Sequence, residues 1–165
     1  MLTNYFRNRF YPLRDTVNHD VVFLRWIEGS LEKEFRVLDI GAGDGSQWKY
    51  FIKGRCHKVI GIDLEEGVLR NTNLDEGVVG DFLKNNFDAE SFDLVMANYF
   101  TEHIKEPAAF LREVRRILKS NGAFYFRTLN MYHYAGIVSR YSPHKFHQYY
   151  MGKLGKAEEH VFPTF

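Results

Sequence analysis

Short apolar runs alternate with segments of helical periodicity along the chain up to about Leu129. The apolar runs, rich in β-branched residues, predict five strands over residues 36–40, 58–62, 77–80, 92–97 and 123–128. Apolar positions at helical spacing predict helices over residues 18–28, 46–53, 65–71 and from Pro107 to the Asn121-Gly122 turn. This alternation predicts an α/β fold, in which a doubly wound, mostly parallel sheet of about five strands carries helices on both faces.

Two of the predicted helices have an apolar face that should pack on the sheet. The face of the first helix consists of Val22, Phe23, Trp26 and Ile27. The face of the last helix consists of Phe110, Leu111, Val114, Ile117 and Leu118. Gly29 is a suitable stop for the first of these helices, and Pro107 suits the first turn of the second.

The pattern divides the chain into three parts. Residues 1–34 form an N-terminal arm and helix, residues 35–130 form the core, and residues 131–165 form an aromatic and histidine-rich cap or tail. The last part has no clear periodicity, and it contains no visible sixth or seventh strand. We interpret residues 1–165 as a single domain, because a chain of this length is sufficient for one core.

Composition and charge narrow the class of protein. The contents of 45% apolar and 26% charged residues are ordinary for a globular domain, and the formal net charge of +1 gives no reason to expect binding to nucleic acid. No apolar run approaches the roughly 20 residues of a membrane-spanning helix. Cys56 is the single cysteine and cannot form an internal disulfide, and the N-terminal residues lack the apolar region of a signal peptide. We therefore expect a cytoplasmic protein.

The first predicted strand leads into a glycine-rich turn, in the stretch VLDIGAGDG. Gly41, Gly43 and Gly45 occupy alternate positions, and glycine permits a positive φ and a close approach of the backbone to a ligand. Backbone N–H groups of the turn and the start of the following helix favour a polar or anionic ligand group. Ligands of doubly wound sheets bind beyond the carboxyl ends of the strands, so we predict a ligand site here.

The next two predicted strands each lead to a carboxylate. Asp63 lies 18 residues after Gly45 and can accept hydrogen bonds from both hydroxyls of a ribose. Asp81 can accept a hydrogen bond from the exocyclic amine of adenine, and Leu64 and Phe82 can sandwich the adenine ring. Three consecutive strand ends therefore each offer one part of an adenosine site.

The turn favours one class of adenosine cofactor over another. A dinucleotide-binding turn has the pattern G-x-G-x-x-G, whereas this turn has Ser46 at the position of the third glycine. Asp44 also places negative charge where a pyrophosphate would lie, and Asp39 is better suited to a ligand that carries an ammonium group. These features favour a methionine-type tail over a pyrophosphate, so a nicotinamide-dependent oxidoreductase is the less favoured hypothesis.

Four segments in order resemble the class I S-adenosylmethionine (SAM)-dependent methyltransferases, type 11-like. They are VLDIGAGDG, VIGIDLEEGVL, GDF and SFDLVMANYFTEHIKEPAAFLREVRRILKSNGAFYFRT, which together span about residues 35–130. A weaker resemblance continues through NMYHY, SPHKFH and EEHVFPT. The resemblance implies a Rossmann-like fold, SAM as the cofactor, and methyl transfer to an unidentified small or medium-sized acceptor. The turn over 119–122 departs from the Pro-Gly-Gly that is usual in the family.

The resemblance also implies roles for individual residues. The cofactor-binding residues would be Asp39, Gly41, Ala42, Gly43, Gly45, Asp63, Leu64, Asp81, Phe82 and Asn98. His103 is the first candidate for a general base, and the others are Tyr99, Glu102, His133 and Tyr134. Methyl transfer from a sulfonium needs no metal, and the histidines at 133, 144, 147 and 160 lack a recognised ligand spacing, so no metal site is predicted.

The family sheet has seven strands, of which the last two form an antiparallel hairpin that this sequence does not predict. The fifth strand would then have an open edge, which is a hazard for aggregation. One hypothesis is that a homo-oligomer or a partner chain covers this edge. A second hypothesis is that the chain is a truncated, non-catalytic SAM-binding remnant, or a subunit that needs a partner.

Overall fold

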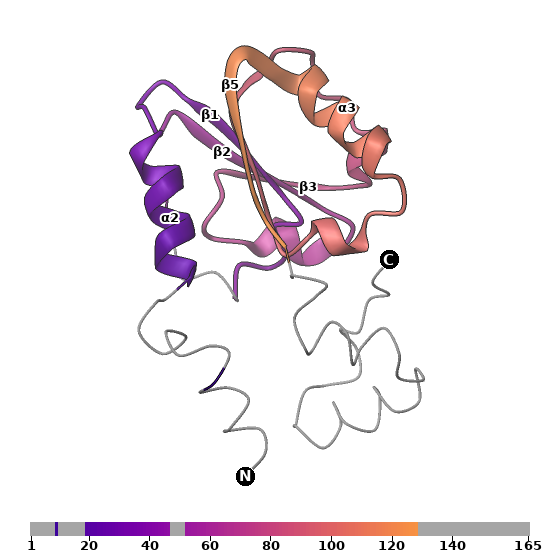
Figure 1. Cartoon of the computed structure of the whole chain (residues 1–165), viewed down its shortest axis with the longest axis horizontal. Coiled ribbons are helices and arrows are strands. Elements are labelled where there is room, and N and C mark those ends of the chain that lie inside the picture. The colour runs from indigo at the N-terminus through magenta and orange to yellow at the C-terminus, as the bar shows by residue number, and fades with distance from the viewer. Residues whose placement is uncertain (1–8, 10–18, 47–51, 129–165) are drawn as a thin grey trace.

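The computed structural model describes residues 9, 19–46 and 52–128 of the chain (Figure 1). Most of the predicted N-terminal arm, most of the helix predicted over 46–53, and the whole predicted cap over 131–165 lie outside these residues. In the part of the chain that the structure describes, no helix has the length and apolar character needed to cross a membrane.

A five-stranded parallel sheet forms the centre of the described structure. Its strands are β1 (Arg36–Ile40), β2 (Lys58–Asp63), β3 (Glu76–Val79), β4 (Phe92–Asn98) and β5 (Leu118–Arg127). The strand order is β3-β2-β1-β4-β5, and each of the four neighbouring pairs is parallel. The predicted α/β sheet is therefore confirmed. The strand order changes direction between β1 and β4, which is the switch point where such sheets bind ligands.

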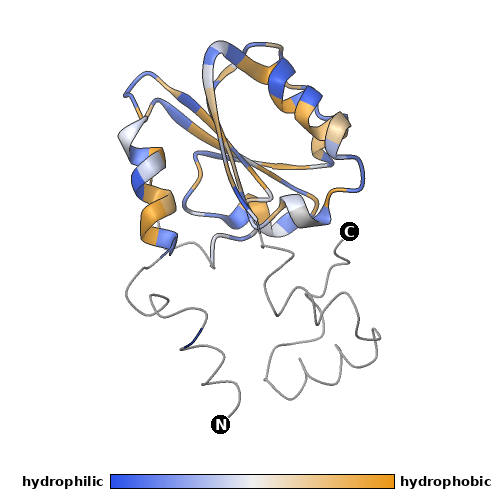
Figure 2. Ribbon diagram, in the orientation of Figure 1, coloured by the Kyte–Doolittle hydropathy of each residue, from blue (hydrophilic) through white to orange (hydrophobic). Residues whose placement is uncertain are grey.

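Helices cover both faces of this sheet, as predicted (Figure 1). The helix α2 (His19–Gly29) packs on one face and α3 (Pro107–Ile117) on the other. Alternating residues of β1 belong to the two cores, because Val37 faces α2 whereas Leu38 and Ile40 face α3. Figure 2 shows hydrophobic stretches along the inner strands, whereas the edge strand β5 is mostly pale or hydrophilic. Three short 3-10 helices complete the fold: η1 (Glu66–Arg70), η2 (Phe82–Lys84) and η3 (Thr101–His103).

The predicted helix faces were too wide. Phe23 and Ile27 of α2 are buried, but Trp26 is 61% exposed. In α3 the side chain of Leu111 is likewise 53% exposed, next to the buried Phe110. Consecutive helix residues point about 100° apart, so each exposed residue lies just outside the stripe that contacts the sheet.

The predicted end of the last helix was wrong. The helix α3 ends at Ile117, and β5 begins at once at Leu118 rather than after Asn121-Gly122. Phe92 pairs with Leu118, whereas Leu94 pairs with Ala123, so the residues between bulge out of the ladder. A Cβ at Gly122 would lie 3.1 Å from the carbonyl oxygen of Asp93, so this glycine permits the bulge to pack against β4 instead of ending a helix.

Candidate functional site

The glycine turn follows β1 at the switch point of the sheet. Gly41, Gly43 and Gly45 have φ values of +74°, +53° and +79°, which other residues rarely adopt. The N–H of Gly41 still donates to the carbonyl oxygen of Ile62, at 2.8 Å, so the turn starts where β2 ends. The predicted turn, with glycine required at alternate positions, is confirmed.

The first glycine is also required by packing. A Cβ on Gly41 would overlap the ring of Phe100, which lies directly over it. Phe100 in turn packs against the α3 side of the core, with its ring centroid 6.0 Å from that of Phe110. The missing side chain at Gly41 therefore lets the turn rest on the core.

Asp63, at the end of β2, is fixed against this turn. Its Oδ2 accepts from the N–H of Gly43 at 2.9 Å, and its Oδ1 accepts from the N–H of Glu65 at 2.9 Å. A carboxylate has about four acceptor positions, so each oxygen retains capacity for a ligand hydroxyl. The structure thus brings together two parts of the predicted site, the turn and the carboxylate of Asp63.

Asp39 is the most unusual group near the turn, because its carboxyl group is buried. The residue is only 6% exposed, and no group among the described residues donates a hydrogen bond to its carboxyl. Burial raises the pKa of Asp39 to about 8, and the nearby negative charge of Asp63 contributes in the same direction. A buried carboxyl in this setting either holds a proton or needs a cation beside it.

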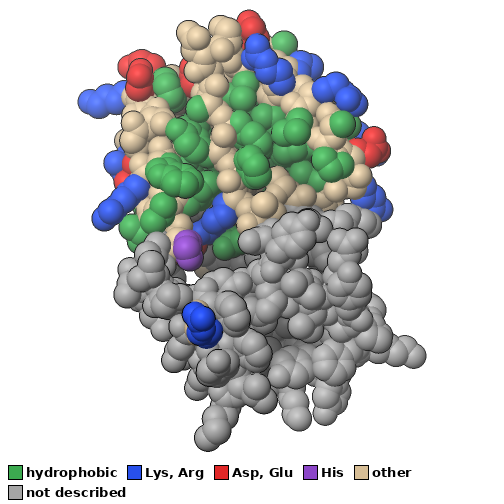
Figure 3. Space-filling model, viewed as in Figure 1, with side chains coloured by type: hydrophobic (Ala, Val, Ile, Leu, Met, Phe, Trp, Pro, Cys, Tyr) green, Lys and Arg blue, Asp and Glu red, His purple; other side chains and the backbone are tan. Residues whose placement is uncertain are grey.

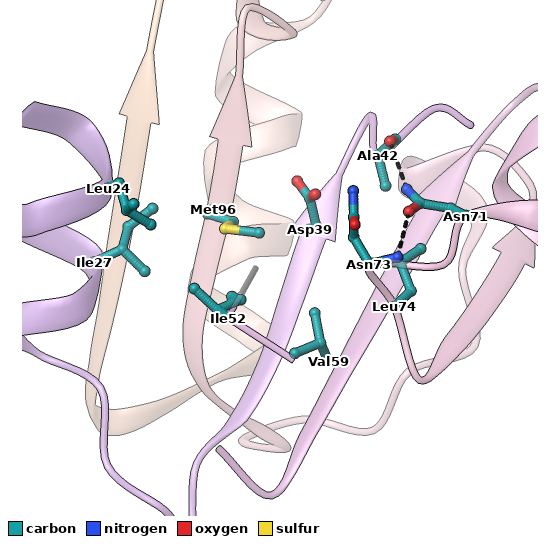
Figure 4. Close-up of a pocket in the computed structure, with 10 residues that line it drawn as sticks. All are labelled: Leu24, Ile27, Asp39, Ala42, Ile52, Val59, Asn71, Asn73, Leu74 and Met96. Atoms are coloured by element: carbon teal, nitrogen blue, oxygen red, sulfur yellow. Dashed lines mark hydrogen bonds between the residues drawn. The ribbon is translucent and has the colours of Figure 1, made fainter. Parts of the chain in front are cut away.

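A small cavity of about 20 Å³ adjoins Asp39 (Figure 4). In the close-up, the polar residues Asp39, Asn71 and Asn73 gather on one side, facing Ile27 of α2 and Met96 of β4. The volume is sufficient for about one water molecule or a group of similar size, such as an ammonium.

Asp81 lies beyond the end of β3, where it caps η2. Its Oδ1 accepts from the N–H of Leu83 at 3.0 Å, and its Oδ2 lies 3.9 Å from Nζ of Lys84. A hollow of about 270 Å³ adjoins it, close to the lower limit of about 300 Å³ for small-molecule sites. Its apolar walls include Val78 and Phe87.

The expectation that Leu64 and Phe82 sandwich an adenine ring is wrong for Phe82. This residue is 4% exposed, and its ring packs on Phe110 with a centroid distance of 5.3 Å. A large apolar ring gains more by burial in the core than by exposure at the strand end, so only the backbone of Phe82 remains near Asp81. Leu64 is 69% exposed and is available to a ligand.

A second polar cluster lies at the ends of β4 and β5, and its central residue, Arg127, was missed from the sequence. Nε of Arg127 donates to Oδ1 of Asn98 at 2.7 Å, and Nη1 lies 2.5 Å from Oδ1 of Asp20 in α2. The guanidinium also lies 4.4 Å from the ring centroid of Tyr99 and 5.3 Å from that of Phe23. The cluster ties α2 to two strand ends through residues far apart in the chain, so no local motif marks it.

The candidate bases are only partly within the described structure. His103 ends η3, and its N–H donates to the carbonyl oxygen of Phe100 at 3.0 Å. Tyr99 precedes η3 with φ of +52°, a strained value for a non-glycine residue. His133 and Tyr134 lie outside the described residues, and a catalytic role for His103 stays a prediction. Residues 9, 19–46 and 52–128 contain no group of three side chains that could hold a metal ion.

The chain is similar to known proteins in sequence and in fold. A family model described as a methyltransferase domain matches residues 38–126, more than half of the chain. A ubiquinone biosynthesis O-methyltransferase of Hahella chejuensis is 33% identical over 104 residues, which cover 58% of this chain and 43% of that protein. The chain spans about half the length of the curated relatives that it matches.

Two solved structures are similar to the described fold. One is an S-adenosylmethionine-dependent methyltransferase from Mesorhizobium loti, with 25% identity and a TM-score of 0.57 over 67% of this chain and 53% of that one. The other is phosphoethanolamine N-methyltransferase 1 of Haemonchus contortus in complex with phosphoethanolamine and S-adenosylhomocysteine, with 25% identity, a TM-score of 0.55, and coverage of 66% of this chain and 26% of that one. The family match includes the glycine turn, Asp63 and Asp81. This chain belongs to the methyltransferase domain family.

Proposed function

We propose that this chain binds S-adenosylmethionine along the carboxyl ends of β1, β2 and β3, and that it catalyses methyl transfer to a small or medium-sized acceptor. The observation that carries the proposal is the fixed position of Asp63, which is joined to the glycine turn by its bond with the N–H of Gly43. Family membership supports the same cofactor, because a similar structure holds S-adenosylhomocysteine, the demethylated form of SAM.

The chemistry of the donor groups fits each part of SAM. The buried carboxyl of Asp39, which no described residue bonds, is suited to the ammonium of the methionine end. Ala42 and the three glycines of the turn would line this end of the cofactor. Asp63 would accept from the ribose hydroxyls, and the hollow beside Asp81 offers apolar walls and a carboxylate to the adenine, with Leu64 nearby.

SAM supplies an activated methyl group on a sulfonium, and the protein supplies orientation and, where the acceptor needs it, removal of a proton. Asn98 ends β4 at the switch point, next to Tyr99 and η3. In our proposal the acceptor approaches over these residues. His103 is the candidate that would take the proton from an oxygen or nitrogen nucleophile.

Calorimetric titration with SAM and with S-adenosylhomocysteine tests the proposal. We expect Asp63→Asn to weaken binding of both ligands about tenfold or more, the effect of losing hydrogen bonds to a charged acceptor. Asp75→Asn is the matched control, because Oδ2 of Asp75 accepts from the N–H of Val59 at 2.8 Å, close to the opposite end of β2. Failure of the wild-type chain to bind either ligand at millimolar concentration, or equal losses in the two variants, would contradict the proposal.

A second candidate function is SAM binding without catalysis by this chain alone. Within the described structure β5 pairs only with β4, and Phe126 on this strand is 53% exposed. Figure 3 shows apolar side chains gathered around β5 on this face of the molecule, with charged side chains around them. A homo-oligomer or a partner chain over this edge therefore remains part of the proposal.

Transfer of the labelled methyl group of SAM to each of a panel of small acceptors distinguishes the two candidate functions. Binding of SAM without transfer to any acceptor, at every protein concentration, would favour the non-catalytic function. Light scattering on the same samples reports whether the chain self-associates. Thermal-shift competition between SAM and nicotinamide dinucleotides tests the less favoured oxidoreductase hypothesis, in which only the dinucleotides would stabilise the protein.

A further inference from the structure

The segment that follows η1 lies against the glycine turn, and Asn71 is its buried member (Figure 4). Asn71 is 7% exposed, although its side chain is polar. Its Nδ2 donates to the carbonyl oxygen of Ala42 at 3.0 Å and to that of Gly43 at 3.2 Å. Its Oδ1 accepts from the N–H of Asn73 at 2.9 Å, so both ends of the amide are bonded.

The contacts of Asn71 and Asp63 meet at a single peptide unit of the turn. The carbonyl of Ala42 and the N–H of Gly43 are opposite ends of one planar group. Asn71 binds the carbonyl end, whereas Asp63 binds the N–H end at 2.9 Å. Two side chains from either side of η1 therefore determine how this peptide plane is rotated.

Asn71 also holds the next peptide unit, between Gly43 and Asp44. Because the carbonyl of Gly43 is bonded to Asn71, the N–H of Asp44 in the same planar group must point away from Asn71. Asn73 extends the contact by donating from Nδ2 to the carbonyl oxygen of Gly45 at 3.3 Å. The carbonyls of the turn thus bond to the segment after η1, and at least one N–H faces the other way.

Gly45 has its own requirement in this arrangement. A Cβ on Gly45 would overlap Oδ1 of Asn71, so the third glycine of the turn makes room for this side chain. The side chain of Asn71 and the absence of one at Gly45 are complementary. This complementarity explains a glycine that a ligand contact alone would not require.

We propose that Asn71 is a positioning residue for the cofactor, which rotates the two peptide units on either side of Gly43 into the orientation that receives the methionine end of SAM. This inference rests on the proposed function, because it assigns the purpose of the rotation to SAM binding. Asn71 itself need not touch the cofactor. It acts through the turn, which is preorganised in this conformation before the ligand binds.

The test compares Asn71→Ala with Asp93→Ala in the full chain. Asp93 is a matched control because its carboxylate also makes two bonds, to the N–H of Arg36 at 2.9 Å and to Nζ of Lys119 at 2.7 Å, at the opposite edge of the sheet. We expect Asn71→Ala to weaken S-adenosylhomocysteine binding about tenfold, because the peptide units of the turn are no longer held in the orientation that binds the ligand. We expect Asp93→Ala to lower the unfolding temperature without a change in affinity. Wild-type affinity in Asn71→Ala, measured well below its unfolding temperature, would overturn the inference.

Amide hydrogen exchange in the ligand-free protein separates this inference from the proposed function. We expect the N–H of Gly43 to exchange faster in Asn71→Ala than in the wild-type chain, and to keep its wild-type rate in Asp93→Ala. Faster exchange together with no ligand binding by the wild-type chain would refute the proposed function but support the positioning of the turn. An unchanged rate would refute the positioning. If Asn71→Ala does not fold, Asn73→Ala, which removes the bond to Gly45, provides the same two readouts with a smaller expected effect.

Discussion

The two halves of the carboxyl edge of the sheet are held together by different kinds of contact. At β1 and β2 the glycine turn is a backbone structure, and the side chains of Asp63 and Asn71 bond to its N–H and carbonyl groups. At β4 and β5 the guanidinium of Arg127 joins side chains of α2 and of both strand ends. We call these the backbone half and the side-chain half.

The difference indicates that the two halves have separate roles, one in binding the cofactor and the other in recognising the acceptor. The turn offers backbone N–H groups, which do not depend on the identity of the turn residues, and this suits a cofactor that is the same in every reaction cycle. A cluster of side chains is altered by single substitutions, which suits recognition of an acceptor. If the proposed function is right, changes to the backbone half should affect the cofactor, and changes to the side-chain half should leave its affinity unaltered.

The largest effect should come from Gly41→Ala, compared with Gly43→Ala. Both glycines have a positive φ, so the conformational strain of alanine is similar at the two positions. Only at Gly41 would the new Cβ overlap Phe100, whereas nothing lies within 4 Å of a Cβ at Gly43. We expect a loss of about 3 kcal/mol in unfolding free energy for Gly41→Ala and of about 1 kcal/mol for Gly43→Ala.

Urea unfolding followed by circular dichroism measures both losses. Equal losses in the two variants would mean that the turn does not rest on the core through Phe100. The backbone half would then be a surface loop, independent of the packing below it.

The backbone half is also the part that could be predicted from the sequence. The apolar runs of β1 and β2 and the alternating glycines lie within one short stretch, so local rules predicted the turn and the strand end at Asp63. Local rules failed for Asn71, which was predicted as the last residue of the helix over 65–71 and belongs to no motif. Its importance comes from the space left by Gly45, a match between two residues that only the folded chain brings together.

The side-chain half and the packing of aromatic residues could not be predicted, because they depend on distant partners. Arg127 contacts Asp20 and Phe23 across most of the domain, and nothing near it in the sequence indicates an ion pair. Phe82 follows a strand end, where the sequence favours a ligand contact, yet Phe110 of α3 offers its ring a buried neighbour. The bulge in β5 likewise depends on the backbone of β4, and so the start of this strand was missed.

The second prediction concerns the buried carboxyl of Asp39 in the backbone half. Its pKa is raised from 3.8 to about 8, so between these values the folded protein holds a proton that the unfolded chain has lost. The free energy of unfolding should therefore fall as the pH rises from about 4 to 8, and change no further through this group above that range. Asp39→Asn cannot titrate and should remove this slope.

We expect Asp39→Asn to gain about 2 kcal/mol of stability relative to the wild-type chain between pH 6 and pH 7.5. Urea unfolding of the ligand-free proteins at intervals across this range measures the gain. A wild-type slope that persists in Asp39→Asn would assign the pH dependence to another group. Bound SAM should reduce the slope in the wild-type chain, because its ammonium would stabilise the charged form of Asp39.

The smallest effect should come from Arg127→Met in the side-chain half. Methionine keeps an apolar stem near the rings of Phe23 and Tyr99, but it loses the bond to Asn98 and the ion pair with Asp20. The side chain of Asp20 is 52% exposed, so solvent already screens the ion pair, and we expect a loss of only about 1 kcal/mol in unfolding free energy. Affinity for S-adenosylhomocysteine should stay within about twofold of wild type if Asn98, which Arg127 bonds, serves the acceptor rather than the cofactor, because Arg127 has no bond to the glycine turn. Urea unfolding measures the loss of stability and calorimetry measures the affinity, with Arg127→Lys as the control variant that keeps the charge.

A loss of affinity in Arg127→Met as large as that in Asn71→Ala would show that the two halves of the edge act as one unit. The separate roles that we assign to the two halves would then be wrong.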